Sequence, residues 1–137
     1  MSVDCLLDTN ILVYAFDKAG QHGQKEQRSR SLIASSNFGT SAQILQEFFV
    51  VVTRKFRRPE TYDRAALQVE ALSRLPCVAI DSHIVVSAIA ISRRFQISYW
   101  DAAVIAAAED IGAPTVYTED LNHGQKYGTV TVINPFT

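Results

Sequence analysis

Four acidic residues in this chain have carboxylates that folding could bring together: Asp8, Glu47, Asp101 and Asp120. Crowded carboxylates repel one another, so their pKa values rise unless a divalent cation neutralises the site. No paired His and no Cys accompanies them at metal-ligand spacing. An oxygen-only site favours a hard cation such as Mg²⁺ or Mn²⁺ over Zn²⁺. The chemistry that these acids could support is therefore binding of a hard cation and the hydrolysis that such a cation assists.

Short apolar strands that alternate with helices must position these acids. We expect strands at residues 3–7, 37–40, 77–80, 115–117 and 130–133. We expect helices at residues 11–16, 22–33, 43–55, 61–75, 82–95 and 98–111. This alternation predicts an α/β domain with a mainly parallel central sheet covered by helices on both faces.

The predicted sheet places the acids at one edge. Ligands of open parallel sheets bind at the carboxyl ends of the strands, and Asp8 and Asp120 follow two of those strands. Asp101 lies in the first turn of a helix. Glu47 lies about two turns inside its helix, on a face distinct from the apolar stripe, and could point into the same crevice.

Each acid also has an ordinary structural explanation. Asp8 could simply cap the helix that follows, and Asp101 stands at the last position of a capping-box pattern. Glu47 could be a paired surface residue, and Asp120 an ordinary turn acid. Asp81 is a useful comparison, because it too follows a strand but directly precedes a helix, which favours capping alone. Spacing by itself leaves both explanations open.

Composition predicts one globular domain over residues 1–137, since 47% of the residues are hydrophobic and 20% are charged. The longest apolar stretches, 84–91 and 102–108, are too short to cross a membrane. The start shows no secretory signal, so we expect a cytoplasmic protein.

Cys5 and Cys77 each lie in an apolar run, which predicts buried thiols rather than a disulfide.

The net charge of −1 excludes the overall basic field of a non-specific nucleic-acid binder, so any nucleic-acid contact must be local. The best candidate is a run of four cations just before Pro59: Arg54, Lys55, Arg57 and Arg58. Cations at the end of a helix also complement the helix dipole, and that role could explain the whole run. The three histidines show no catalytic pairing by spacing.

The chain resembles the PIN-domain family and, within it, the VapC-type ribonuclease toxins of toxin–antitoxin pairs. The resemblance covers nearly the whole chain and rests on the segments LLDTNILV at 6–13, SAQILQE at 41–47, SYWDA at 98–102, YTEDLNHG at 117–124 and VINPF at 132–136. One such segment is a weak signal, whereas four acidic blocks in this order are specific. The family implies a three-layer α/β/α sandwich and usually a homodimer.

The resemblance also implies roles for individual residues. The family's acidic quartet, which holds the metal and catalyses, falls on Asp8, Glu47, Asp101 and Asp120. Supporting roles fall on Asn10, Thr118 and Glu119, although the family pattern places its acid one position after Glu119. Asn122 stands where many relatives carry another Asp, so a second metal would be held weakly.

The activity implied by the resemblance is Mg²⁺- or Mn²⁺-dependent hydrolysis of RNA phosphodiester bonds by an endoribonuclease. Water would attack the scissile phosphorus in line, with Asp8 or Glu47 helping to remove its proton. The products would carry 5′-phosphate and 3′-hydroxyl ends. The implied partners are the RNA substrate, a second copy of the chain and a cognate antitoxin that inserts a peptide into the acidic crevice.

Other functions explain the acids less well. A receiver-like phosphoacceptor domain needs two adjacent acids after the first strand, and this chain lacks them. It also needs a Lys at the end of a late strand, and this chain has Thr118 and Glu119 there. A haloacid-type phosphatase needs Asp-x-Asp, and this chain has Asn10 at the second acidic position. The main alternative is a non-catalytic PIN-like module that binds RNA or protein. Retention of all four acids argues against that alternative.

Overall fold

The computed structural model describes residues 3–17 and 23–137 of the chain. Within them, the strands are β1 (Cys5–Leu7), β2 (Phe38–Ser41), β3 (Cys77–Val78), β4 (Thr115–Tyr117), β5 (Lys126–Tyr127) and β6 (Val130–Ile133). The helices are α1 (Thr9–Phe16), α2 (Gln24–Ser35), α3 (Ala42–Lys55), α4 (Thr61–Leu72), α5 (Ser82–Phe95) and α6 (Tyr99–Ile111). The strands form one sheet in the order β3-β2-β1-β4-β6-β5.

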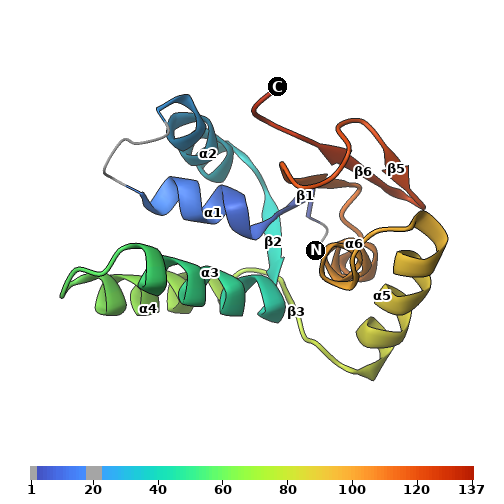
Figure 1. Cartoon of the computed structure of the whole chain (residues 1–137), viewed down its shortest axis with the longest axis horizontal. Coiled ribbons are helices and arrows are strands. Elements are labelled where there is room, and N and C mark those ends of the chain that lie inside the picture. The colour runs from blue at the N-terminus through green and yellow to red at the C-terminus, as the bar shows by residue number, and fades with distance from the viewer. Residues whose placement is uncertain (1–2, 18–22) are drawn as a thin grey trace.

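The sheet is mainly parallel and lies between two layers of helices, as predicted. Every strand pair is parallel except β5 with β6, which is antiparallel. Figure 1 shows α1 to α4 on one side of the sheet and α5 and α6 on the other, with α6 directly against the strands. None of the helices in the described part of the chain is long and apolar enough to span a membrane.

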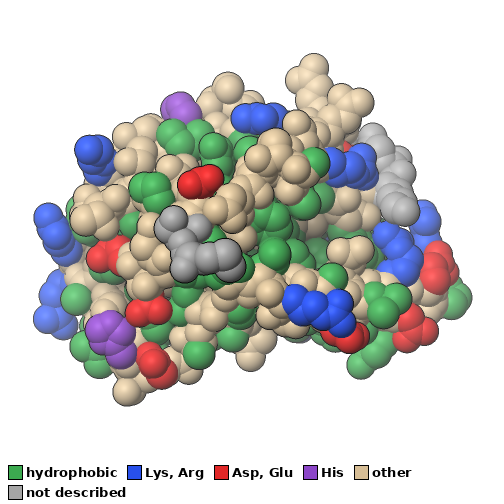
Figure 2. All heavy atoms as spheres, turned by 180° about the vertical axis from the view of Figure 1, so that it is seen from behind, with side chains coloured by type: hydrophobic (Ala, Val, Ile, Leu, Met, Phe, Trp, Pro, Cys, Tyr) green, Lys and Arg blue, Asp and Glu red, His purple; other side chains and the backbone are tan. Residues whose placement is uncertain are grey.

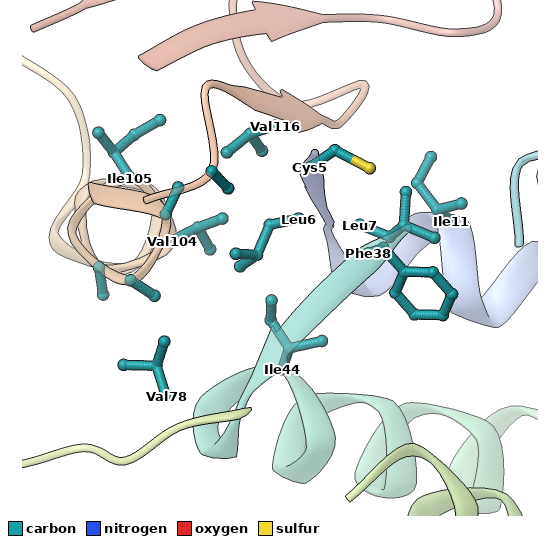
Figure 3. Close-up of a cluster of buried hydrophobic side chains, with 14 of the residues drawn as sticks. Cys5, Leu6, Leu7, Ile11, Phe38, Ile44, Val78, Val104, Ile105 and Val116 are labelled. Atoms are coloured by element: carbon teal, nitrogen blue, oxygen red, sulfur yellow. The ribbon is translucent and has the colours of Figure 1, made fainter. Parts of the chain in front are cut away.

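Strand β1 lies at the centre of the core, and its side chains alternate between the two faces of the sheet. Leu6 points toward Val104 of α6, whereas Leu7 points to the side of α1 (Figure 3). Leu6 and Val116 of β4 are completely buried. This packing fixes β1 and β4 side by side with Leu7 opposite Tyr117, so the two strands end at the same level.

Capping residues begin the helices where the sequence predicts them. The side chain of Ser41 accepts a hydrogen bond from the amide of Ile44, and that of Asp81 accepts one from Ile84 at 3.0 Å. Gly112 ends α6 in the left-handed conformation, with φ of 75°, which Gly adopts without steric cost. These local signals explain why most helix boundaries could be predicted within a few residues.

Several boundaries were predicted wrongly, and one strand was not predicted. The short strand β5, which forms a hairpin with β6, has only two residues and gave no recognisable pattern. Helix α4 ends at Leu72 rather than residue 75, and β3 ends at Val78 rather than residue 80. The predicted start of the second helix, His22, lies outside the described residues.

The two cysteines have different environments. Cys5 is 2% exposed in the central strand, as predicted. Cys77 is exposed, so the prediction of a buried thiol was wrong there. Its strand β3 is at the edge of the sheet, next to β2 alone, and the helix layers leave that side chain uncovered.

Candidate functional site

Asp8 and Thr118 leave the sheet next to each other, because each directly follows one of the paired strands β1 and β4. The Thr118 hydroxyl donates a hydrogen bond of 2.8 Å to Asp8 Oδ2, and the Thr9 amide donates one of 2.7 Å to Asp8 Oδ1. Burial of the Asp8 carboxyl raises its pKa to about 6. The two hydrogen bonds oppose that rise, and repulsion from Asp120 and Glu47 adds to it.

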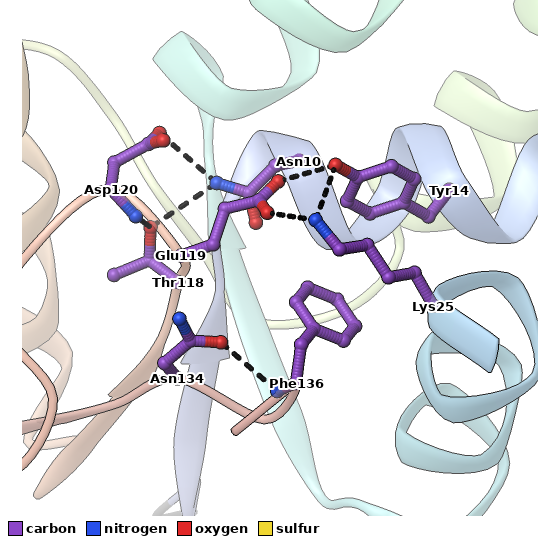
Figure 4. A network of polar contacts seen from close by, with 8 residues as sticks. All are labelled: Asn10, Tyr14, Lys25, Thr118, Glu119, Asp120, Asn134 and Phe136. Carbon is purple, nitrogen blue, oxygen red and sulfur yellow. Dashed lines mark hydrogen bonds and ion pairs between the residues drawn. The ribbon is translucent and has the colours of Figure 1, made fainter. Parts of the chain in front are cut away.

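Asn10 and Thr118 connect Asp8 to Asp120. The Asn10 side-chain amide donates to Asp120 Oδ2 at 3.0 Å and to the Thr118 hydroxyl oxygen at 3.2 Å (Figure 4). The backbone amide of Asp120 also donates to the Thr118 hydroxyl oxygen, at 3.1 Å. The Asn10 Oδ1 atom is buried and has no hydrogen-bond partner among the described residues. Asn10 therefore keeps one oxygen available near the acids.

Glu47 reaches the same place from α3. Its Oε2 accepts a hydrogen bond of 3.1 Å from the Thr9 hydroxyl, and its Oε1 accepts one of 2.9 Å from the Gln43 side chain. The Gln43 amide also donates to the backbone oxygen of Trp100 at 3.4 Å. Glu47 is thus tied to α1 on one side and, through Gln43, to the first turn of α6 on the other.

Asp101 lies in that first turn, and its cap contact uses its backbone. The Ser98 hydroxyl oxygen accepts a hydrogen bond from the Asp101 amide at 3.1 Å, so the capping explanation holds for the amide. Partial burial raises the pKa of the Asp101 carboxyl, its hydrogen bond with Ser98 lowers it, and repulsion from Asp120 and Glu47 raises it. The structure thus places all four predicted acids within electrostatic reach of their neighbours.

The acids fit a hard cation in type and charge, but they do not form a closed cage. Within residues 3–17 and 23–137, no group of three or more His, Cys, Asp or Glu side chains is arranged to hold a metal ion. Mg²⁺ usually binds through one or two carboxylates and keeps several waters for exchange with substrate phosphate. A pocket of about 270 Å³, lined in part by Thr9, Asn10, Glu47 and Asp120, offers room for such a hydrated ion.

Glu119, the third residue predicted to support the site, points away from the acids. Its Oε2 accepts a hydrogen bond of 2.6 Å from the Tyr14 hydroxyl, and its Oε1 pairs with Lys25 Nζ at 2.8 Å (Figure 4). Lys25 Nζ also lies over the rings of Tyr14 and Phe136, at 5.2 and 5.4 Å from their centroids. Glu119 therefore anchors the loop after β4 to α1 and α2. No sequence pattern indicated Lys25, which lies 94 positions from its partner.

We expect Glu119→Gln to lower the melting temperature by about 3 °C, because an ion pair with partly exposed members contributes about 1 kcal/mol or less. Solvent screens the pair, since the Lys25 side chain is 40% exposed. Thermal unfolding checks this, with Glu70→Gln as the matched control, because its pair with Arg74 is exposed on both sides. Equal melting temperatures for the two variants would show that the contact of Glu119 with Lys25 does not stabilise the fold.

The basic run begins in the last turn of α3 and is only partly at the site. Lys55 lines the acidic pocket together with Glu47 and Asp120. Arg57 instead donates from Nε to the backbone oxygen of Arg54 at 3.2 Å, as the helix-end explanation predicts. On the face seen in Figure 2, the Lys and Arg side chains are scattered rather than gathered into one basic surface. Lys55 is therefore the member of the run with a place at the acids.

Comparison with known proteins gives one family and several solved structures with a similar fold. The family model described as PIN domain matches residues 5–128. No curated protein sequence matches the chain. Among solved structures, FitAB bound to the IR36 DNA fragment has a TM-score of 0.73 at 20% identity, covering 97% of this chain and 96% of that one.

Two further similar structures come from named bacteria. A toxin–antitoxin complex from Klebsiella pneumoniae has a TM-score of 0.71 at 20% identity, covering 96% of this chain and 97% of that one. VapC20 of Mycobacterium tuberculosis, described as a toxin that cleaves the sarcin-ricin loop, has a TM-score of 0.67 at 18% identity over 85% and 89% of the two chains. At these identities, the similarity establishes a shared fold.

Proposed function

This chain belongs to the PIN-domain family, and from that premise we propose that it is a metal-dependent endoribonuclease that hydrolyses RNA phosphodiester bonds. One observation carries the proposal. Asp8, whose pKa is raised, is linked through Thr118 and Asn10 to Asp120 at the carboxyl ends of two parallel strands. Repulsion from Asp120 and Glu47 adds to the raised pKa of both Asp8 and Asp101, and such a concentration of negative charge suits a site that binds a hard cation.

The roles of the residues follow from their contacts. Mg²⁺ or Mn²⁺, when bound through one or two of these carboxylates, would supply positive charge that offsets the repulsion among the acids and stabilises charge on the phosphate. Asp8 accepts a proton more readily than an ordinary Asp because burial raises its pKa to about 6. Asp8 or Glu47 removes a proton from the attacking water. Thr118 and Asn10 keep Asp8 and Asp120 in their relative positions.

We further propose the biological setting of this activity. Several of the similar structures are described as toxin–antitoxin complexes or as VapBC bound to DNA. The chain is accordingly proposed to be the toxin of a type II pair in the cytoplasm, to form a homodimer, and to be inhibited by an antitoxin peptide in the acidic crevice.

The test incubates the purified protein with total RNA in Mg²⁺, in Mn²⁺ and in EDTA, and maps the ends of the fragments. We expect cleavage with either metal, none in EDTA, and 5′-phosphate with 3′-hydroxyl ends, because the scheme consumes no ribose 2′-hydroxyl. Fragments ending in 2′,3′-cyclic phosphate would contradict the proposed chemistry. Intact RNA under all three conditions would favour the non-catalytic binding module.

A further inference from the structure

The side chain of Trp100, directly before Asp101, is a large aromatic surface left in solvent beside the acids. It is 63% exposed, although a Trp side chain is usually mostly buried. Its ring contacts that of Tyr99 edge to face, with centroids 5.1 Å apart. Its backbone oxygen accepts a hydrogen bond from the same Gln43 amide that donates to Glu47. The position of Trp100 is therefore coupled to that of a candidate catalytic acid.

Two hollows along α3 connect Trp100 to the acids. One, of about 480 Å³, is lined by Trp100, Glu47 and Val51 among others. The other is the pocket of about 270 Å³ at the acids, and it shares Glu47 and Val51 with the first. Lys55 lines this second pocket. The two neighbouring hollows together form a track along α3, with an indole ring at one end, carboxylates in the middle and a cation at the other.

This order of groups matches a single strand of RNA. Aromatic side chains stack on nucleobases, and cations contact the phosphates on either side. The acids alone would repel an RNA backbone, so productive binding needs attraction from groups next to them. A peptide could use the apolar walls, but it offers no phosphate for Lys55.

We propose that Trp100 is the platform on which one base of a single-stranded RNA substrate stacks, while Lys55 contacts a phosphate on the far side of the acids. This inference rests on the proposed ribonuclease function and adds the residues that would hold an unpaired base and a phosphate next to the cleaved bond. Trp100 binds and selects substrate in this account and takes no part in the bond-breaking step.

The chain offers a direct signal for this contact, because Trp100 is its only Trp. We expect a short, unstructured oligoribonucleotide in EDTA to quench the Trp fluorescence through base stacking. Inorganic polyphosphate carries backbone-like charge without bases and should leave the fluorescence unchanged. Equal quenching by both, or no quenching by the oligoribonucleotide, would overturn the proposal and leave the groove to a protein partner.

Steady-state cleavage gives the second test. Trp100→Ala should raise KM about tenfold with kcat within about twofold, because loss of one stacked base weakens binding by that order. Trp100→Phe should restore most of the loss. Tyr62→Ala is the matched control, since Tyr62 is also 63% exposed but lines neither hollow, and both constants should stay unchanged. A loss confined to kcat in Trp100→Ala would overturn the role in binding.

Lys55→Gln addresses the other end of the track. We expect it to weaken RNA binding by a similar factor for every sequence and to reduce the salt dependence of binding by about one phosphate contact. An unchanged salt dependence would contradict the phosphate contact.

Failure of this inference is distinguishable from failure of the proposed function. Fluorescence quenching without cleavage in either metal would refute the ribonuclease and retain the base-binding site. Cleavage without quenching, and with an unchanged KM in Trp100→Ala, would refute the stacking platform and retain the ribonuclease.

Discussion

Asp8→Asn is expected to lower kcat for RNA cleavage by about 10²- to 10⁴-fold, the range found when a general base or a key charge-stabilising group is removed. The side chain keeps its size, and an Asn carbonyl can still accept the hydrogen bond from the Thr9 amide. The variant loses the negative charge and the capacity to accept from the Thr118 hydroxyl. The loss should therefore come from chemistry rather than from unfolding, which circular dichroism of the variant can check.

Asp81→Asn is the matched control for this experiment. Asp81 also caps a helix, through its hydrogen bond with the Ile84 amide, and Asn caps helices about as well as Asp does. Unlike Asp8, it is exposed and its carboxyl does not interact with the other acids named above. We expect Asp81→Asn to keep the wild-type kcat. A similar loss in both variants would mean that Asp8 matters only as a cap.

The melting temperature of the metal-free wild type is expected to fall relative to that of Asp8→Asn as the pH rises. The folded-state pKa of Asp8 is raised from 3.8 to about 6, so the folded protein binds this proton more tightly than the unfolded chain does. The resulting stability is complete below pH 3.8 and is lost as the pH rises toward about 6. Between about pH 4.5 and pH 7.5, the loss amounts to about 2 kcal/mol, or about 6 °C.

Thermal unfolding of both proteins in EDTA across this range measures the effect. Comparison with Asp8→Asn removes the contributions of other titrating groups, because the two chains differ at one position. A constant difference between the two melting temperatures would show that Asp8 is not desolvated as the structure indicates.

A divalent cation should reverse this effect in the wild type. A ligand present at about 100 times its dissociation constant stabilises the folded state by about 2.7 kcal/mol. We therefore expect Mg²⁺ or Mn²⁺ to raise the wild-type melting temperature by several degrees at about pH 7.5 and to raise that of Asp8→Asn much less. Equal shifts in the two proteins would place the cation away from Asp8.

The central strands and the positions of the acids could be predicted because strong local signals coincide there. Cys5–Leu7 and Thr115–Tyr117 are short runs of residues that favour strands, and the residue after each is polar. Parallel pairing then brings Asp8 beside Thr118 without further assumptions. For Glu47, the helix face left a surface role open as well, and the resemblance to the PIN-domain family assigned it to the acids. Its contacts with Thr9 and Gln43 agree with that assignment.

The contacts that depend on distant side chains could not be predicted. The pairing of Glu119 with Lys25 joins positions far apart in the chain, and neither residue stands in a recognisable motif. The exposure of Cys77 depends on how much of an edge strand the helices cover, which local hydrophobicity does not encode. The track from Trp100 to Lys55 likewise exists only once α3 and α6 are packed together.

The central claim is that the acids at the ends of β1 and β4 share a hard divalent cation. Crystals soaked in Mn²⁺ and measured for anomalous scattering test it most directly. The account predicts an anomalous peak within coordination distance of Asp8 or Asp120, absent from crystals of Asp8→Asn. A map whose peaks all lie on other surfaces, with these carboxylates in contact only with protein and water, would contradict it.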